Sequence, residues 1–223
     1  KISIMRKLAR AASIVNVVVN VFLFIVKIAV GFIFSSVSIV ADAINSLSDV
    51  IASVFIYISV KINDEKPDET HEFGHTRAEN IAGYTVGLLM FFLGFSVVKI
   101  AVNKIISHTP AQYSIYMLLV VAITFFLKLA MFLYVGYVLS KQYSPALKAN
   151  LRDHLNDIII ILGVLVAIIS IRLGYFFVDP LVGIIIGVFV LKGGFDICRE
   201  NISYLMGVPA GKKMIKRIKD VVE

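Results

Sequence analysis

Six uninterrupted apolar stretches, each about 20 residues or longer, constrain this chain more than any other feature of its sequence. A helix of that length crosses the hydrocarbon core of a bilayer and satisfies its own backbone hydrogen bonds there. The stretches do not alternate between apolar and polar residues, so a membrane β-barrel is excluded. The chain is 59% hydrophobic, against roughly 45–50% in soluble domains. We therefore predict an all-α polytopic membrane protein.

The predicted spans cover residues 12–34, 37–62, 78–106, 113–140, 145–173 and 178–206. The first span is too long for the apolar region of a signal peptide, and no small-residue cleavage site follows it. The fifth span begins with a polar third, from Lys148 to Asp157, before its apolar run. That amphipathic start must face protein or water, because charged groups are costly against lipid.

Lys and Arg residues are concentrated on one side of these spans. They stand at Lys1, Arg6, Lys7, Arg10, Lys61, Lys66, Arg77, Lys141, Lys148, Lys212, Lys213, Lys216, Arg217 and Lys219. The opposite connections carry only Lys104 and Arg172, near their edges. The positive-inside rule therefore predicts that both termini are cytoplasmic. The same asymmetry explains the formal net charge of +7, so we expect the lipid bilayer, and no nucleic acid, as a partner.

Two regions follow from this pattern. Residues 1–208 are predicted to form a six-helix transmembrane domain. Residues 209–223 alternate apolar residues with lysines at helical spacing, which is typical of a soluble amphipathic helix. We interpret this tail as the start of a cytoplasmic C-terminal domain that is missing or cut short. The expected location is the cell membrane, as a multi-pass protein.

Polar side chains interrupt two of the spans at a spacing of four residues. Asn45 and Asp49 lie in the second span, and Asp153 and Asp157 lie in the fifth. This spacing places both members of each pair on one helix face, about one turn apart. An Asp at the centre of a membrane helix costs roughly 2.5–3.5 kcal/mol on insertion scales. The two pairs therefore predict a cation site where the two helices face each other.

The chemistry of these four side chains favours exchange of a metal ion for protons. Three carboxylates and one amide offer oxygen ligands, and a bound dication leaves a net charge near −1 when all three acids are ionised (−3 + 2). A low-dielectric environment favours the protonated carboxyl group, whereas a bound metal ion favours the carboxylate. Metal and protons therefore compete for the same oxygens, which is the physical basis of metal/proton antiport.

Other polar residues of the spans have less specific interpretations. Asn45, taken alone, is equally consistent with a hydrogen bond to a neighbouring helix. Asp42 and His154 lie off the faces of the two pairs, by about 60° and about 100°, so we place them around the site. Lys27 and Lys128 either extend toward the membrane surface or pair with Asp42.

Three segments resemble the cation diffusion facilitator family. The second span reads Ser38-Ile-Val-Ala-Asp-Ala-Ile-Asn-Ser-Leu-Ser-Asp49, and the fifth carries Asp153-x-x-x-Asp157. The connection after the second span reads Pro67-Asp-Glu-Thr-His-Glu-Phe-Gly-His75, followed by Arg77-Ala-Glu79. The resemblance extends over essentially the whole chain. It implies a homodimeric divalent-cation/proton antiporter with six spans and a cytoplasmic C-terminal domain, which exports metal from the cytoplasm.

The resemblance also implies which residues bind metal. The family's transport site falls here on Asn45, Asp49, Asp153 and Asp157, and its zinc-transporting members commonly have His in place of Asp153. With no imidazole among the four, the oxygen-only set favours Mn²⁺ as the transported ion and is similar to the bacterial manganese-exporting branch. Zn²⁺, Fe²⁺, Cd²⁺, Co²⁺ and Ni²⁺ remain alternatives, because affinity alone disfavours Mn²⁺.

A second metal site is expected from the connection between the second and third spans. Asp68, His71 and His75 are spaced three and four residues apart, so one helical turn gathers them. The alternative is a solvated polar loop.

For the whole chain we expect transport without enzymatic activity. A metal-gated channel or sensor without proton coupling is the other functional class, and a membrane-embedded metalloenzyme is a weaker alternative.

Overall fold

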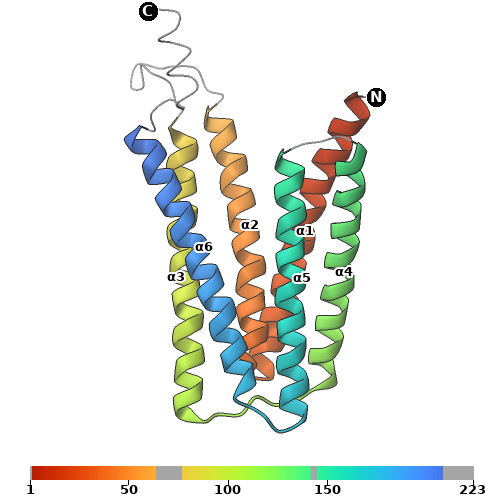
Figure 1. Cartoon of the computed structure of the whole chain (residues 1–223), viewed down its shortest axis with the longest axis vertical. Coiled ribbons are helices and arrows are strands. Elements are labelled where there is room, and N and C mark those ends of the chain that lie inside the picture. Colours follow the sequence, from red (N-terminus) through yellow and green to blue (C-terminus); the bar gives the residue numbers. More distant parts are fainter. Residues whose placement is uncertain (1, 64–76, 142–144, 208–223) are drawn as a thin grey trace, which may run out of the picture.

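The computed structural model describes residues 2–63, 77–141 and 145–207, and it places a helix on each of the six predicted spans (Figure 1). The helices are α1 (Ile2–Ile33), α2 (Val37–Asn63), α3 (Ala78–Ser107), α4 (Ile115–Lys141), α5 (Pro145–Arg172) and α6 (Val178–Met206). All six are long and apolar enough to cross a membrane. The main difference from the prediction is that α1 begins at Ile2, because the helix continues into the basic segment before its apolar run.

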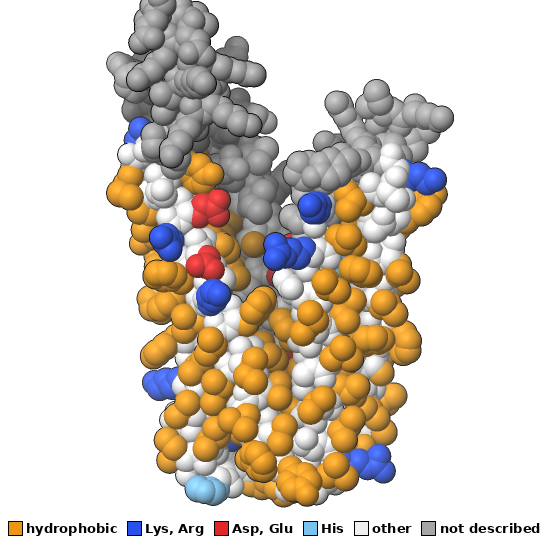
Figure 2. Space-filling model, in the orientation of Figure 1, with side chains coloured by type: hydrophobic (Ala, Val, Ile, Leu, Met, Phe, Trp, Pro, Cys, Tyr) orange, Lys and Arg blue, Asp and Glu red, His pale blue; other side chains and the backbone are white. Residues whose placement is uncertain are grey.

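The start of α1 and the end of α6 lie at the same end of the bundle, here called the terminal end (Figure 1). Toward that end the helices separate into two groups, with α2, α3 and α6 on one side and α1, α4 and α5 on the other. Toward the opposite end, here called the far end, the two groups come together. On the face seen in Figure 2, apolar side chains cover most of the surface toward the far end, and most of the charged side chains lie toward the terminal end.

The most extensive helix pair is α3 with α6. Small residues allow this close approach, since a Cβ atom added at Gly94 would lie 2.5 Å from the backbone nitrogen of Leu191. A Cβ atom added at Gly194 would likewise lie 2.5 Å from the backbone nitrogen of Phe91. Dispersion between closely packed backbones holds membrane helices together where the hydrophobic effect contributes little.

The helix at the centre of the bundle is α2, which contacts α1, α3, α5 and α6. Every residue from Ser36 to Ser46 is buried, whereas the residues from Asp49 to Phe55 are partly or fully exposed. An apolar cluster surrounds the buried half; its members include Ile39, Ala41, Val97, Met117, Val121, Val164, Ile168 and Ile186. The bundle is therefore tightly packed on the far side of Asp49 and more open on the terminal side.

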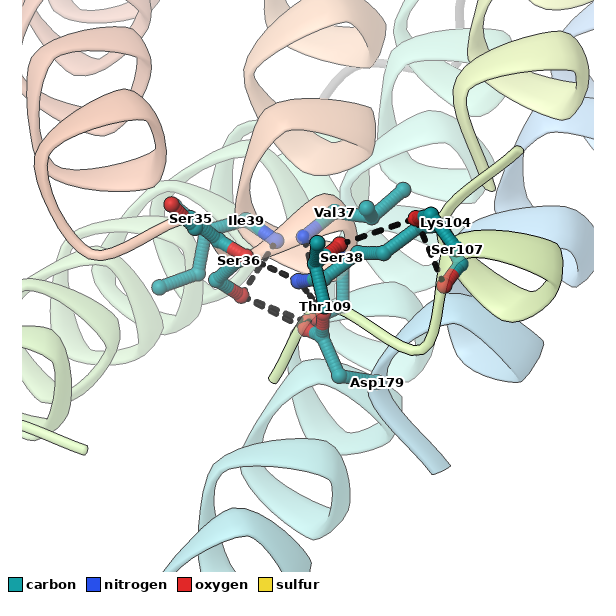
Figure 3. Close-up of polar contacts among 9 residues, drawn as sticks. All are labelled: Ser35, Ser36, Val37, Ser38, Ile39, Lys104, Ser107, Thr109 and Asp179. Atoms are coloured by element: carbon teal, nitrogen blue, oxygen red, sulfur yellow. Dashed lines mark hydrogen bonds and ion pairs between the residues drawn. The ribbon is translucent and has the colours of Figure 1, made fainter. Parts of the chain in front are cut away.

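The buried carboxylate of Asp179 links α6 to α2 and α3 at the far end of the bundle (Figure 3). Asp179 of α6 accepts hydrogen bonds from the hydroxyl groups of Ser36 and Ser38, at 2.6 and 2.7 Å. It also accepts hydrogen bonds from the backbone N–H groups of Val37 and Ser38, at 2.9 and 3.2 Å, and so caps the start of α2. Lys104 of α3 forms an ion pair with it at 3.1 Å. This network ties α2, α3 and α6 together.

Candidate metal centre

The structure places the four predicted site residues near the middle of two neighbouring antiparallel helices, α2 and α5. Asp49 and Asp157 each lie about midway along their helix. The Asn45 amide donates a hydrogen bond from Nδ2 to Asp157 Oδ1 at 2.9 Å. Residues 112 positions apart are thus brought into direct contact. The predicted meeting of the two polar faces is therefore present in the fold.

Three of the four residues share one cavity of about 150 Å³. Its walls are formed by Asn16, Asp49, Ala52, Ser53, Asn150, Asp153, His154 and Asp157. Asn45 is not among the lining residues, and it reaches the cavity through its hydrogen bond to Asp157. The cavity is large enough for a hydrated cation, because a water molecule occupies about 30 Å³ of liquid volume.

The cavity lies toward the terminal end of the acids. Since α2 runs toward that end and α5 runs away from it, the lining residues Ala52, Ser53 and Asn150 are all closer to it than Asp49 and Asp157 are. The far side is closed by the buried half of α2. Asp49 keeps 34% of its side-chain surface exposed, whereas Asp157 keeps only 10% of its own exposed. A cation therefore meets Asp49 and Asp153 before it meets Asp157.

The four side chains are close together but do not form a closed coordination shell. Within the described parts of the chain, no three acidic, histidine or cysteine side chains are arranged to hold a metal ion. The amide of Asn45 presents its nitrogen, not its oxygen, to Asp157. Metal coordination by this set requires rotation of the amide and of the carboxylates, which are changes of side-chain torsion within the cavity.

A lysine that the sequence analysis did not connect to the site lies against it. Lys128 of α4 is 1% exposed, and its ammonium group contacts Asp157 Oδ2 at 2.5 Å and Asp49 Oδ2 at 3.9 Å. The expectation that it extends to the surface or pairs with Asp42 was therefore wrong. It lies in the middle of its helix and its side chain is too short to reach the interface. The spacing pattern gave no signal for it, because a single Lys carries no periodicity.

The other buried lysine, Lys27, pairs with Asp42, which is one of the two alternatives predicted for it. Lys27 of α1 forms an ion pair with Asp42 at 2.8 Å and donates a hydrogen bond to Ser46 Oγ at 3.2 Å.

His154 lines the cavity and is 3% exposed, and its Nδ1 has no hydrogen-bond partner among the described residues. His154 was expected around the site, and it lies in the cavity wall.

The candidate loop site at Asp68, His71 and His75 lies outside the described residues. Its sequence has a feature that bears on enzymatic function, because residues 71–75 read His-Glu-Phe-Gly-His. This matches the His-Glu-x-x-His pattern, which binds zinc in metalloproteases when it lies on a helix. The pattern occurs here in the connection between two membrane helices, α2 and α3. The pattern indicates that His71 and His75 are candidate metal ligands.

Comparisons with known proteins agree with the architecture. The family described as the cation efflux transmembrane domain matches residues 13–206. An uncharacterized transporter of Methanocaldococcus jannaschii is 36% identical over 205 residues, covering 92% of this chain and 72% of its own. The manganese efflux system proteins MneS and MneP of Bacillus subtilis are 28% and 26% identical, covering 96% and 97% of this chain and 76% and 75% of their own. The chain is therefore a multi-pass membrane protein that belongs to the cation diffusion facilitator family of cation-efflux transporters.

Proposed function

We propose that this protein exports Mn²⁺ from the cytoplasm across the cell membrane in exchange for protons, as a homodimer, through a site formed by Asn45, Asp49, Asp153 and Asp157. The strongest support is one cavity, about midway along α2 and α5, that the three carboxylates line together. The names of two relatives, both manganese efflux system proteins, support the choice of metal. The oxygen-only character of the four side chains supports it independently, since hard cations prefer oxygen ligands.

The position of the cavity supports entry of the metal from the cytoplasm. It lies toward the terminal end, which the distribution of Lys and Arg assigns to the cytoplasm. A cytoplasmic cation therefore has access to Asp49 and Asp153, while the packed far half blocks its exit. Alternating access then requires the far half to open as the terminal half closes around the site. Protons from the outer side neutralise the carboxylates and release the metal.

The experiment is metal uptake into inside-out membrane vesicles that contain the purified protein. A proton gradient across the vesicle membrane should drive Mn²⁺ inward, and internal pH should change as the metal moves. Asp49→Ala and Asp157→Ala should each abolish that uptake, because either change removes a charged oxygen ligand. Normal uptake in both variants would refute the assignment of the site.

Two alternatives have separate signatures in the same assay. A Zn²⁺, Fe²⁺ or Cd²⁺ exporter of the same family would move its own metal in preference to Mn²⁺ when the metals compete at equal concentration. A metal-gated channel would move metal with no change in internal pH, and a sensor without transport would move no metal. The carboxylate-lined cavity favours a coupled transporter over a channel, because the far half of the bundle is packed and closed.

A further inference from the structure

Four helices of the bundle converge on one ammonium group. Lys128 lies midway along α4, and it is 1% exposed. Its Nζ atom lies 2.5 Å from Asp157 Oδ2 of α5, 2.7 Å from Asn20 Oδ1 of α1 and 3.9 Å from Asp49 Oδ2 of α2. An ammonium group has three N–H donors, and it needs such oxygen partners when it is buried. The Lys128 ammonium therefore occupies a cation position between the acids of the two site helices.

The contacts of Asp157 leave neither of its oxygens free of a donor. Asn45 Nδ2 donates to Oδ1 at 2.9 Å, and Lys128 Nζ donates to Oδ2 at 2.5 Å. A metal ion bound by Asp157 draws on these same oxygens, and a dication and an ammonium group at contact distance repel each other strongly in a medium of low dielectric constant. Binding of metal to Asp157 therefore works against the Lys128 contact.

We propose that Lys128 is a tethered competitor for the transported metal, which holds Asp157 whenever the metal does not and so lowers the affinity of the site. This inference rests on the proposed function of the same site. The charges give its direction: the three ionised acids and Lys128 sum to −2 (−3 + 1), whereas the acids alone sum to −3. Lys128 removes one unit of the attraction for a dication, and its return to Asp157 assists release.

A purely structural role makes a different prediction. If the ion pair only holds α4 against α5, its removal changes the stability of the fold. The affinity of a folded variant for the metal should then stay unchanged. The chain offers a matched control in Lys27, which is also 1% exposed and pairs with Asp42 at 2.8 Å. Asp42 does not line the cavity. Removal of Lys27 breaks its ion pair with Asp42, whereas removal of Lys128 breaks its pairs with Asp157 and Asp49, which both line the cavity.

The test is a direct Mn²⁺ titration of purified protein in detergent, by calorimetry, on the unchanged chain and on Lys128→Gln, Lys27→Gln and Asp157→Ala. Glutamine keeps a hydrogen-bond donor and removes the charge. Lys128→Gln should lower the Kd for Mn²⁺ by about tenfold or more, because a repelling charge near the metal is lost. It should also slow vesicle uptake at saturating Mn²⁺, since release becomes harder. Lys27→Gln should leave the Kd within about threefold of the unchanged chain.

The outcomes separate this inference from the proposed function. If Asp157→Ala keeps full Mn²⁺ binding, the site assignment itself fails. If Asp157→Ala loses binding while Lys128→Gln leaves the Kd unchanged or raises it, the competitor role alone is overturned. Should Lys128→Gln not fold, Lys128→Arg decides the matter. A guanidinium group pairs with a carboxylate through two hydrogen bonds, so this variant should weaken Mn²⁺ binding. Unchanged or tighter binding in Lys128→Arg would overturn the inference.

Discussion

Replacement of Asp179 by Ala tests the far-end network most directly. The change removes the carboxylate that accepts two hydroxyl and two backbone hydrogen bonds and the Lys104 ion pair. The serine hydroxyl groups rotate and regain partners, but the N–H groups of Val37 and Ser38 lose their cap. That loss costs about 1 kcal/mol, and Lys104 loses its ion pair while it keeps its hydrogen bond to the Ser35 carbonyl, so the total is about 3 kcal/mol.

The assay is reversible unfolding in mixed micelles, with the free energy of unfolding measured for the unchanged chain and for Asp179→Ala. Asp179→Asn is the matched variant, because it keeps one acceptor oxygen and loses only the charge, and it should fall between the two. The Kd for Mn²⁺ should stay within about threefold in both variants, since the network lies far from the cavity. A loss of less than about 1 kcal/mol in Asp179→Ala would refute the view that this carboxylate fastens α2.

Three further predictions concern the site and the helix packing. Asp157→Ala should reduce Mn²⁺ uptake into inside-out vesicles to background, and residual saturable uptake would contradict its role as a ligand. Asn45→His and Asp153→His should each shift the metal preference toward Zn²⁺ in competition assays, because imidazole is a softer ligand than oxygen; an unchanged preference in both would remove the basis for Mn²⁺. Gly94→Val should separate α3 from α6 and lower the unfolding midpoint, since an added Cβ would lie 2.5 Å from the Leu191 nitrogen, and an unaltered midpoint would argue against that packing.

The positions of the helices could be predicted closely from the sequence. Hydrophobic length alone decides whether a segment spans a bilayer, so α2, α3, α5 and α6 match the predicted spans within one residue at each end. The pairing of Asn45 with Asp49, and of Asp153 with Asp157, was also predictable, because residues four apart share a helix face whatever the fold. That α2 and α5 bring these faces together was predicted from the cost of burying the acids in a membrane, and the contact between the two faces is present in the structure.

The partners of the buried lysines could not be predicted in the same way. Lys27 and Lys128 each lie alone in an apolar helix, and an isolated cation has no period that points to a neighbour. Both Asp42 and Asp157 are acids within reach of such a cation. The choice depends on which helices lie side by side and at what depth, which is a property of the whole bundle. The same holds for Asp179, whose capping of α2 joins residues 142 positions apart.

By itself, the sequence determined the six spans and the chemistry of the two polar faces, because the bilayer imposes rules of length and hydrophobicity on each segment separately. Only the tertiary structure decided that the cavity lies toward the terminal end, and that Lys128 pairs with Asp157. Those features arise from distances between helices, and no single segment encodes them.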